Sequence, residues 1–176
     1  MLEALEVIVD TNIIIGAIFN QFENEDSWQI LKLLRTNKIR PVVSEPLLRE
    51  YQIAPTKMVI DTLFEDIKYI NALDIQECKT DLYKCFGEIA TIMFKARMVE
   101  VTSKRKECLD PEDDKLYNLA VDSNCSKIVT KNVYDFSPID GKSKTKNGKL
   151  IEIYTPSQFM VVAKTFGWAQ SLKAKI

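Results

Sequence analysis

The sequence predicts an α/β fold in which helices cover both faces of a parallel sheet. Short apolar runs alternate along the chain with longer segments of helical periodicity, and this alternation is typical of strand–helix–strand units. The run at residues 5–9 is almost continuously apolar, as in a strand that is buried on both faces of such a sheet. The chain has 176 residues, of which 46% are hydrophobic and 28% charged, so we expect one domain over residues 1–176.

Five strands and seven helices follow from this pattern. The strands are expected at residues 5–9, 41–43, 99–102, 127–130 and 150–154. The helices are expected at residues 11–19, 27–36, 45–53, 56–70, 81–98, 112–123 and 157–166. Residues 137–149 contain one proline, two glycines and four lysines, which favours a mobile surface insertion.

Composition narrows the classes of protein to consider. No stretch approaches the roughly 20 apolar residues of a membrane span, and the first residues lack the basic start of a signal peptide. We therefore expect a cytoplasmic protein without a membrane partner. Its cysteines show no Cys-x-x-Cys spacing and are expected to stay reduced; they are Cys78, Cys85, Cys108 and Cys125.

The sequence contains no histidine. This absence excludes imidazole general-base catalysis and a zinc site of the usual histidine-containing type. A metal held by side chains of this chain would lie among oxygen atoms, which select hard ions such as Mg²⁺ or Mn²⁺.

The first candidate site residue is Asp10, which directly follows the strand predicted at residues 5–9 and precedes Thr11 and Asn12. Ligands of open α/β sheets bind at the carboxyl ends of the strands, so Asp10 is placed to take part in chemistry. The alternative is that Asp10 caps the helix that begins at Thr11.

A second carboxylate, Glu50, is expected on the helix at residues 45–53. Ser44 can cap this helix and Pro46 suits its first turn, which leaves Glu45 with little beyond a favourable interaction with the helix dipole. Glu50 lies near Leu47 along the helix and is expected to point inward. An inward glutamate is costly unless it is paired or binds a metal.

An acidic cluster precedes the helix expected at residues 112–123. A helix start explains much of it, with Asp110 as the cap, Pro111 in the first turn and Asp113 in the position of a capping box. Asp114 shares a side of the helix with Asn118, and the helix dipole would keep it ionised. We therefore favour Asp114 as the site residue of this cluster.

The fourth group follows the strand at residues 127–130. Thr130, Asn132 and Asp135 should emerge at the same edge of the sheet as Asp10, and Asn132 and Asp135 can share one helical turn. The alternative is ordinary turn chemistry, in which Asn and Asp are common.

A cluster of carboxylates at one edge of the sheet would need a compensating positive charge. Two like charges about 4 Å apart repel by about 4 kcal/mol at an effective dielectric constant near 20, so such a cluster is stable with a cation or with shared protons. A divalent cation also activates water for attack on phosphorus, and hydrolysis of phosphodiesters is the natural chemistry of the predicted site.

The motifs described above, taken in their order along the chain, resemble those of the PIN domain family. The matching motifs are residues 7–12 (Val-Ile-Val-Asp-Thr-Asn), 44–51, 110–120 and 128–136. Residues 150–159 resemble the closing strand and helix of a PIN subgroup described as toxin components. The resemblance covers essentially the whole chain and is weakest at residues 56–107.

The resemblance implies a three-layer α/β/α fold and a metal-dependent endoribonuclease, as in toxins of the VapC type. It implies RNA as substrate, Mg²⁺ or Mn²⁺ as cofactor, and an antitoxin protein and a second copy of the chain as partners. Many members carry an aspartate where this chain has Asn132, so Asp135 or Asn132 itself would complete the site. The expected catalytic and metal-binding residues are Asp10, Glu50, Asp114 and Asp135, supported by Thr11, Asn12, Asp113, Thr130 and Asn132.

A degenerate PIN domain that binds RNA or protein without catalysis is the alternative. The sequence pI of about 5.7 offers no overall attraction for phosphates. The basic residues are local instead, and they serve equally well as RNA contacts or as solvated loop residues: Lys104, Arg105, Lys106, Lys142, Lys144, Lys146 and Lys149.

Overall fold

The computed structural model of the chain describes residues 4–19, 25–65 and 72–166. The strands are β1 (Leu5–Val9), β2 (Ile39–Val43), β3 (Arg97–Met98), β4 (Lys127–Val129) and β5 (Glu152–Tyr154). The helices are α1 (Thr11–Phe19), α2 (Glu25–Arg35), α3 (Glu45–Glu65), α4 (Ala72–Met93), α5 (Asp114–Ser123), the 3₁₀ turn η1 (Val133–Phe136) and α6 (Pro156–Thr165).

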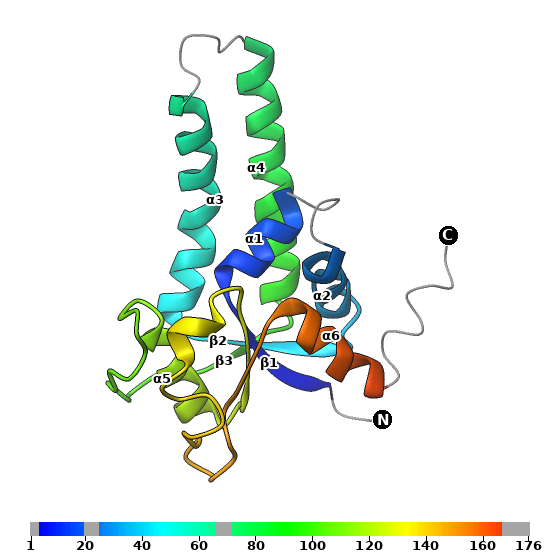
Figure 1. Cartoon of the computed structure of the whole chain (residues 1–176). Coiled ribbons are helices and arrows are strands. Elements are labelled where there is room, and N and C mark those ends of the chain that lie inside the picture. Colours follow the sequence, from blue (N-terminus) through cyan, green and yellow to red (C-terminus); the bar gives the residue numbers. More distant parts are fainter. Residues whose placement is uncertain (1–3, 20–24, 66–71, 167–176) are drawn as a thin grey trace.

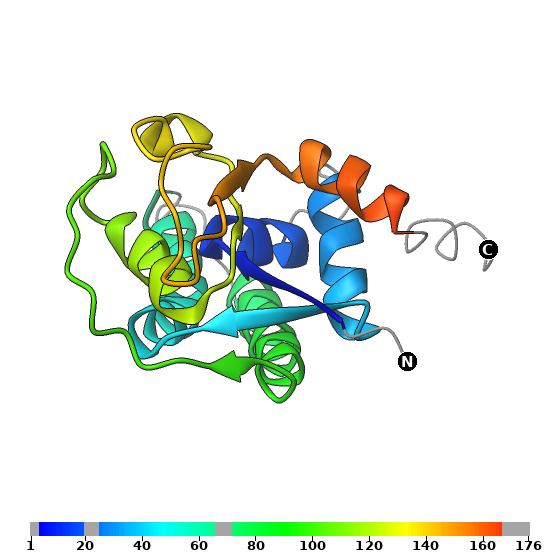
Figure 2. The same ribbon diagram turned by 90° about the horizontal axis from the view of Figure 1, so that it is seen from below.

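The strands form one parallel sheet in the order β3-β2-β1-β4-β5. Val7 of β1 lies beside Pro41 of β2, and Val9 lies beside Val129 of β4. Helices α1 to α4 lie on one side of the sheet and α5 lies on the other, while α6 packs against α2 (Figures 1 and 2). The expected three-layer α/β/α fold with a central parallel sheet is confirmed.

The core fills the space between these layers. The inner strands contribute Val7, Ile8, Val42 and Ile128, all completely buried, and this double-sided burial explains the apolar run at residues 5–9. Burying each such side chain contributes about 1.5–3 kcal/mol before the loss of conformational entropy is counted. Within the described ranges, no helix is both long and apolar enough to cross a membrane.

One continuous helix, α3, replaces the two helices expected at residues 45–53 and 56–70. Pro55 lies inside it and removes a backbone donor, at a typical cost of about 3 kcal/mol. The helix continues because Tyr51 and Val59 on either side of Pro55 are buried and α3 packs against both α1 and α4. The end of the second expected helix lies outside the described residues. Helices α3 and α4 extend side by side away from the sheet (Figure 1).

The edge of the sheet also differs from the expectation. Helix α4 spans Ala72–Met93, whereas the periodic pattern predicted a helix at residues 81–98. The strand expected at residues 99–102 is formed instead by Arg97 and Met98, which pair with Val42 and Val43 of β2. Pairing with β2 therefore overrides the local helical pattern, since propensity is weaker than tertiary hydrogen bonding.

Three polar side chains on one side of α5 hold the irregular chain that follows β3. Asp114, Asn118 and Asp122, which we name the anchoring row, are spaced four residues apart and therefore share one helix face. The chain that they hold, residues 99–108, is named the anchored segment.

Each member of the anchoring row binds backbone groups. Asp114 Oδ1 accepts the N–H groups of Glu107 and Cys108, both at 3.0 Å. Asn118 binds both the N–H and the C=O of Arg105, each at 2.9 Å. Asp122 Oδ2 accepts the N–H groups of Thr102 at 2.6 Å and Ser103 at 2.8 Å. The anchored segment thus has a defined path although it is neither helix nor strand.

The lysine-containing stretch at residues 137–149, expected to be a mobile surface insertion, packs against the domain. Ile139 and Thr145 are buried, and the Lys146 N–H donates to the Val121 carbonyl. The Lys146 ammonium also lies 2.8 Å from the Asp122 carboxylate, of which 2% is exposed. The stretch is therefore attached to α5, because Lys146 bonds to the Val121 carbonyl and to the Asp122 carboxylate of that helix.

Replacing Asp122 by asparagine should lower the free energy of unfolding by about 2–4 kcal/mol at pH 7, because buried amides lose a charged acceptor. Burial alone would raise the pKa of Asp122, but hydrogen bonds from Lys146, Ser103 and Thr102 outweigh it and lower the pKa. This stabilisation is present above the unfolded-state pKa of about 4 and is lost as the pH falls toward the folded-state value.

Urea unfolding at pH 7 and pH 3 measures the effect, and the gap between wild type and D122N should narrow at the lower pH. Asp81→Asn is the matched control, since Asp81 forms one exposed ion pair with Lys84 and should change stability by less than about 0.5 kcal/mol. Equal midpoints for wild type and D122N at pH 7 would contradict the anchoring role.

Candidate active site

A pocket of about 500 Å³ opens at the carboxyl edge of the sheet, between the start of α1, the side of α3 and the chain that leads into α5. Its acidic lining residues are Asp10, Glu50, Asp61, Asp110, Glu112 and Asp113. Its basic lining residues are Lys57 and Lys115, and Thr11, Asn12 and Asn132 add polar groups. We name it the carboxylate pocket.

Asp10 is fixed by the neighbouring strand. Its N–H donates to the Val129 carbonyl at 2.8 Å, which continues the ladder between β1 and β4. Its Oδ2 accepts hydrogen bonds from Thr130 Oγ1 at 2.6 Å and Asn12 Nδ2 at 2.7 Å. Burial raises the pKa of Asp10, the Thr130 hydroxyl opposes this, and the Glu50 carboxylate adds to it. The Asp10 carboxylate is thus oriented by side chains at the ends of two adjacent strands.

Glu50 reaches the pocket from α3. Its Oε2 lies 3.0 Å from Lys115 Nζ, and the Lys115 ammonium also donates to the Glu112 carbonyl at 2.8 Å. Glu45, on the same helix, is turned outward and forms an exposed ion pair with Arg49. The two glutamates therefore differ in the way that the helical periodicity predicts.

Tyr51 holds the backbone directly before Asp10. The Tyr51 ring is completely buried and its hydroxyl donates to the Val9 carbonyl, one residue before Asp10. Burial, with the nearby Asp10 and Glu50 carboxylates, raises the pKa of Tyr51 well above its ordinary value, so this donor keeps its proton.

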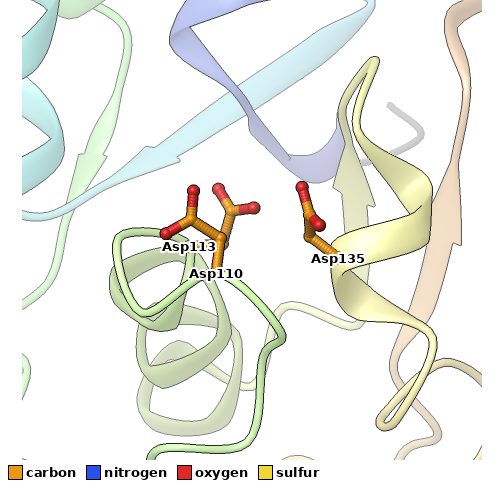
Figure 3. A group of neighbouring side chains, drawn as sticks. All are labelled: Asp110, Asp113 and Asp135. Atoms are coloured by element: carbon orange, nitrogen blue, oxygen red, sulfur yellow. The ribbon is translucent and has the colours of Figure 1, made fainter.

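Three further carboxylates come together beside Asp10. Asp110, Asp113 and Asp135 each offer an oxygen atom, and these atoms lie within 4.8 Å of one another. Figure 3 shows Asp110 and Asp113 on the chain that leads into α5, with Asp135 facing them from η1. Burial raises the pKa of Asp113 to about 7, and the Asp10, Asp110 and Asp135 carboxylates act in the same direction. Asp113 is 8% exposed, so its carboxylate is the buried member of the cluster.

Asp114, which was expected to be a catalytic and metal-binding site residue, lies outside the pocket lining. Its Oδ1 binds the Glu107 and Cys108 amides as part of the anchoring row. Asp113, expected at a capping-box position and as a supporting residue of the site, lines the pocket. A signal in the sequence could have shown this: Asn118 and Asp122 follow Asp114 at intervals of four residues, which indicates one polar row on α5.

The expected supporting residues gather near Asp10. Thr11, Asn12 and Asn132 line the pocket, while Thr130 holds Asp10 and accepts the Asn132 N–H at 3.0 Å. Thr11 Oγ1, Asn12 Oδ1 and Asp113 Oδ2 are buried and have no hydrogen-bond partner within the described part of the chain. Three oxygen atoms are therefore available to a bound species.

The basic residues that were expected to contact RNA do not line the carboxylate pocket. Arg105 Nη1 donates to the Tyr117 hydroxyl at 3.0 Å, and Lys146 pairs with Asp122. The other five are exposed and do not line the carboxylate pocket: Lys104, Lys106, Lys142, Lys144 and Lys149. Lys57 and Lys115, which do line it, were not singled out in the sequence because only the fold brings them to the acidic residues.

Comparison with known proteins agrees with this geometry. The family model described as the PIN domain matches residues 6–134 of the chain. Searches of the curated proteins and of the solved structures find no match. The matched region holds β1 to β4, the carboxylate pocket and the start of η1, and it covers well over half of the 176 residues. Because the family model covers more than half of the chain, the chain belongs to the PIN domain family, whose fold is a nuclease fold.

Proposed function

We propose that the chain is a metal-dependent endoribonuclease that hydrolyses RNA phosphodiesters in the carboxylate pocket. The observation that carries this proposal is the convergence of Asp10, Glu50 and Asp113 on one pocket, with Asp110 and Asp135 beside Asp113. The three come from the end of β1, the side of α3 and the start of α5. Such repulsive neighbours are retained where a cation is bound.

The donor set supports a hard divalent cation. The pocket is lined by carboxylate, amide and hydroxyl oxygens, and the buried Asn12 Oδ1 and Asp113 Oδ2 have no protein partner among the described residues. Oxygen ligands of this kind select Mg²⁺ or Mn²⁺. When bound, such an ion supplies Lewis-acid stabilisation of the charge that develops at a phosphodiester. We assign its binding to Asp10, Glu50 and Asp113, with Asp135 providing the charge that Asn132 lacks.

The remaining residues have positioning roles in this proposal. Thr130 and Asn12 orient Asp10, and Lys115 offsets repulsion around Glu50. Lys57 also lines the pocket and is the cationic side chain best placed to contact an RNA phosphate, since Lys115 pairs with Glu50.

Asp114 acts indirectly in this scheme, although it was expected to be a ligand. Its carboxylate fixes the Glu107 and Cys108 amides and so holds the chain on which Asp110 and Asp113 are mounted. Asp113 takes the place in the acidic core that was expected for Asp114.

A role as the toxin of a toxin–antitoxin pair is the finer form of the proposal. Its support is the resemblance of residues 150–159, which form β5 and the start of α6, to a toxin-component subgroup. An antitoxin protein and a second copy of the chain would be the partners. Inspection of the neighbouring genes for a small antitoxin is the observation that tests this role.

A non-catalytic binding module is the second candidate function. It is favoured by the ion pair between Lys115 and Glu50, which already neutralises one acid of the pocket, and by Asn132 at the fourth motif. A manganese titration of the purified protein separates the two candidates, because a binding module needs no ion.

Asp113→Asn should reduce Mn²⁺-dependent RNA cleavage about 100- to 1,000-fold, as expected for loss of a preorganised electrostatic group. Stability should stay equal or rise, since the substitution removes a buried charge from a repulsive cluster.

Asp114→Asn is the matched control at the neighbouring residue. It should lose about 1–2 kcal/mol of stability and keep cleavage within about tenfold, because it removes charge from an anchoring hydrogen bond. Single-turnover rates and urea midpoints of both variants measure this, and a larger loss of rate in D114N would reverse the assignment.

Glu50→Gln should lower the single-turnover rate at saturating RNA, whereas Glu45→Gln should leave this rate of the chemical step unchanged. Glu50 lines the pocket and pairs with Lys115, while Glu45 has 69% of its side chain exposed and faces outward. Single-turnover rates at saturating Mn²⁺ compare the two directly on one helix. Equal losses from both substitutions would remove Glu50 from the site.

Metal binding should release a proton near neutral pH, because the pKa of Asp113 is raised to about 7. In the metal-free protein the folded state holds this proton between the unfolded-state pKa of about 4 and the folded value, so stability falls as pH rises through that window. D113N should lack this slope. Calorimetry of Mn²⁺ binding in two buffers with different ionisation enthalpies measures the released proton, and identical heats in wild type would contradict the prediction.

A further inference from the structure

A second cavity, of about 620 Å³, lies directly beside the carboxylate pocket and shares Lys115 with it. Its walls are the start of α3, the anchored segment and one side of α5. Its polar side chains include Ser44, Glu100, Ser103 and Asn118. Because Lys115 borders both cavities, an RNA strand bound in the carboxylate pocket can extend past this side chain toward the second cavity.

We propose that this second cavity binds a nucleobase of the RNA strand next to the phosphodiester that is cleaved, and that it selects bases with an exocyclic amino group over uracil. The inference rests on the proposed function, since it assigns a substrate subsite to the same enzyme. Single-stranded RNA is read in this manner, with individual bases turned out of the stack and bound on their edges.

The charge of the cavity favours a base over a phosphate. Two carboxylates, Glu45 and Glu100, line it, and its one lysine, Lys115, already pairs with Glu50. Glu45 is held by Arg49, whereas no described residue bonds to the Glu100 carboxylate. An unpartnered carboxylate accepts hydrogen bonds from amino groups such as that of cytosine. Uracil presents a carbonyl oxygen at the same position and would be repelled.

The remaining lining suits the flat faces of a base. Pro46, Met98, Val99 and Val101 supply apolar surface, and 54% of Met98 is exposed to an incoming group. A methionine adapts its shape to flat ligands. The volume lies within the about 300–1,000 Å³ usual for small-molecule sites. Ser44, directly before α3, is 1% exposed and its Oγ has no hydrogen-bond partner among the residues that the structure describes, so the wall of the cavity holds a polar atom whose hydrogen-bonding capacity is unused.

The cavity is also preorganised. Ser103 is held by Asp122 and Arg105 by Asn118, while the Val99 N–H donates to the Val43 carbonyl at 2.9 Å. The anchored segment is therefore ordered before a ligand binds, so that binding does not include the entropic cost of ordering this wall of the cavity.

Two measurements test the proposal. The first compares kcat/KM for RNA oligonucleotides that differ only in the bases flanking the cleaved bond, where replacing uracil by cytosine at one position should raise the value about tenfold or more. Glu100→Gln should erase this preference, because glutamine can donate to the uracil carbonyl as well as accept. Glu77→Gln, an exposed glutamate on α4, is the matched control and should keep the preference.

The second measurement does not depend on cleavage. Amide NMR spectra of the metal-free protein are recorded with cytidine and with uridine, which differ in the group at position 4 of the base. Cytidine should shift the amide signals of Val101, Ser103 and Asn118 more strongly and at lower concentration than uridine, and E100Q should remove the difference.

The outcomes separate the two proposals. Cleavage with the same base preference in wild type and E100Q, together with unshifted cavity amides, overturns the base subsite and leaves the nuclease standing. Absence of Mn²⁺-dependent cleavage, together with a cytidine-selective shift that E100Q loses, overturns the nuclease and supports a base-binding cavity. A cytosine preference and a cytidine shift that both disappear in E100Q support both.

Discussion

Strand β1 lies at the centre of the sheet, with β2 on one side and β4 on the other, so the connections after β1 and after β4 diverge at this point. A crevice forms where strand order reverses, and the first residues after both strands border it. Asp10 follows β1, Thr130 follows β4, and a 2.6 Å hydrogen bond joins their side chains across the reversal. Helix α3 and the start of α5 then bring Glu50 and Asp113 to the same place. The topology of five short strands thus fixes which residues can meet.

Electrostatic repulsion among the acidic side chains determines the charge state of the carboxylate pocket. Burial and the neighbouring acids keep the pKa of Asp113 near 7, while Lys115 offsets part of the charge from Glu50. The site is therefore held together by its scaffold and not by attraction among its members. Tyr51 holds the backbone before Asp10, and the anchoring row holds the chain before Asp113, so residues outside the pocket fix the positions of the acids that line it.

The sequence predicted those parts of the site that depend on local pattern. Asp10 ends an apolar run, and Glu50 and Asp135 follow from strand and helix periodicity, so each could be placed on its element without knowledge of the rest. Asp113 and Asp114 are neighbours at a helix start, where boundary patterns alone do not distinguish them. The sequence signal that separates them lies further along, in the four-residue spacing of Asp114, Asn118 and Asp122, and the structure brings Asp113 to the pocket. The ends of α4 and β3 depend on pairing with β2, which is a long-range contact. Lys115 and the second cavity arise from segments far apart in the sequence.

The anchoring row grips the anchored segment chiefly by its main chain, through the amides of residues 102, 103, 105, 107 and 108. A main-chain amide is the same whichever side chain the residue carries. Side chains such as Glu100 and Val101 can therefore change during evolution while the path of the backbone and the positions of the acids persist. Proteins that keep Asp114, Asn118 and Asp122 would share the same backbone path beside the carboxylate pocket yet differ in the side chains that the anchored segment presents there, since those side chains contribute little to holding the fold.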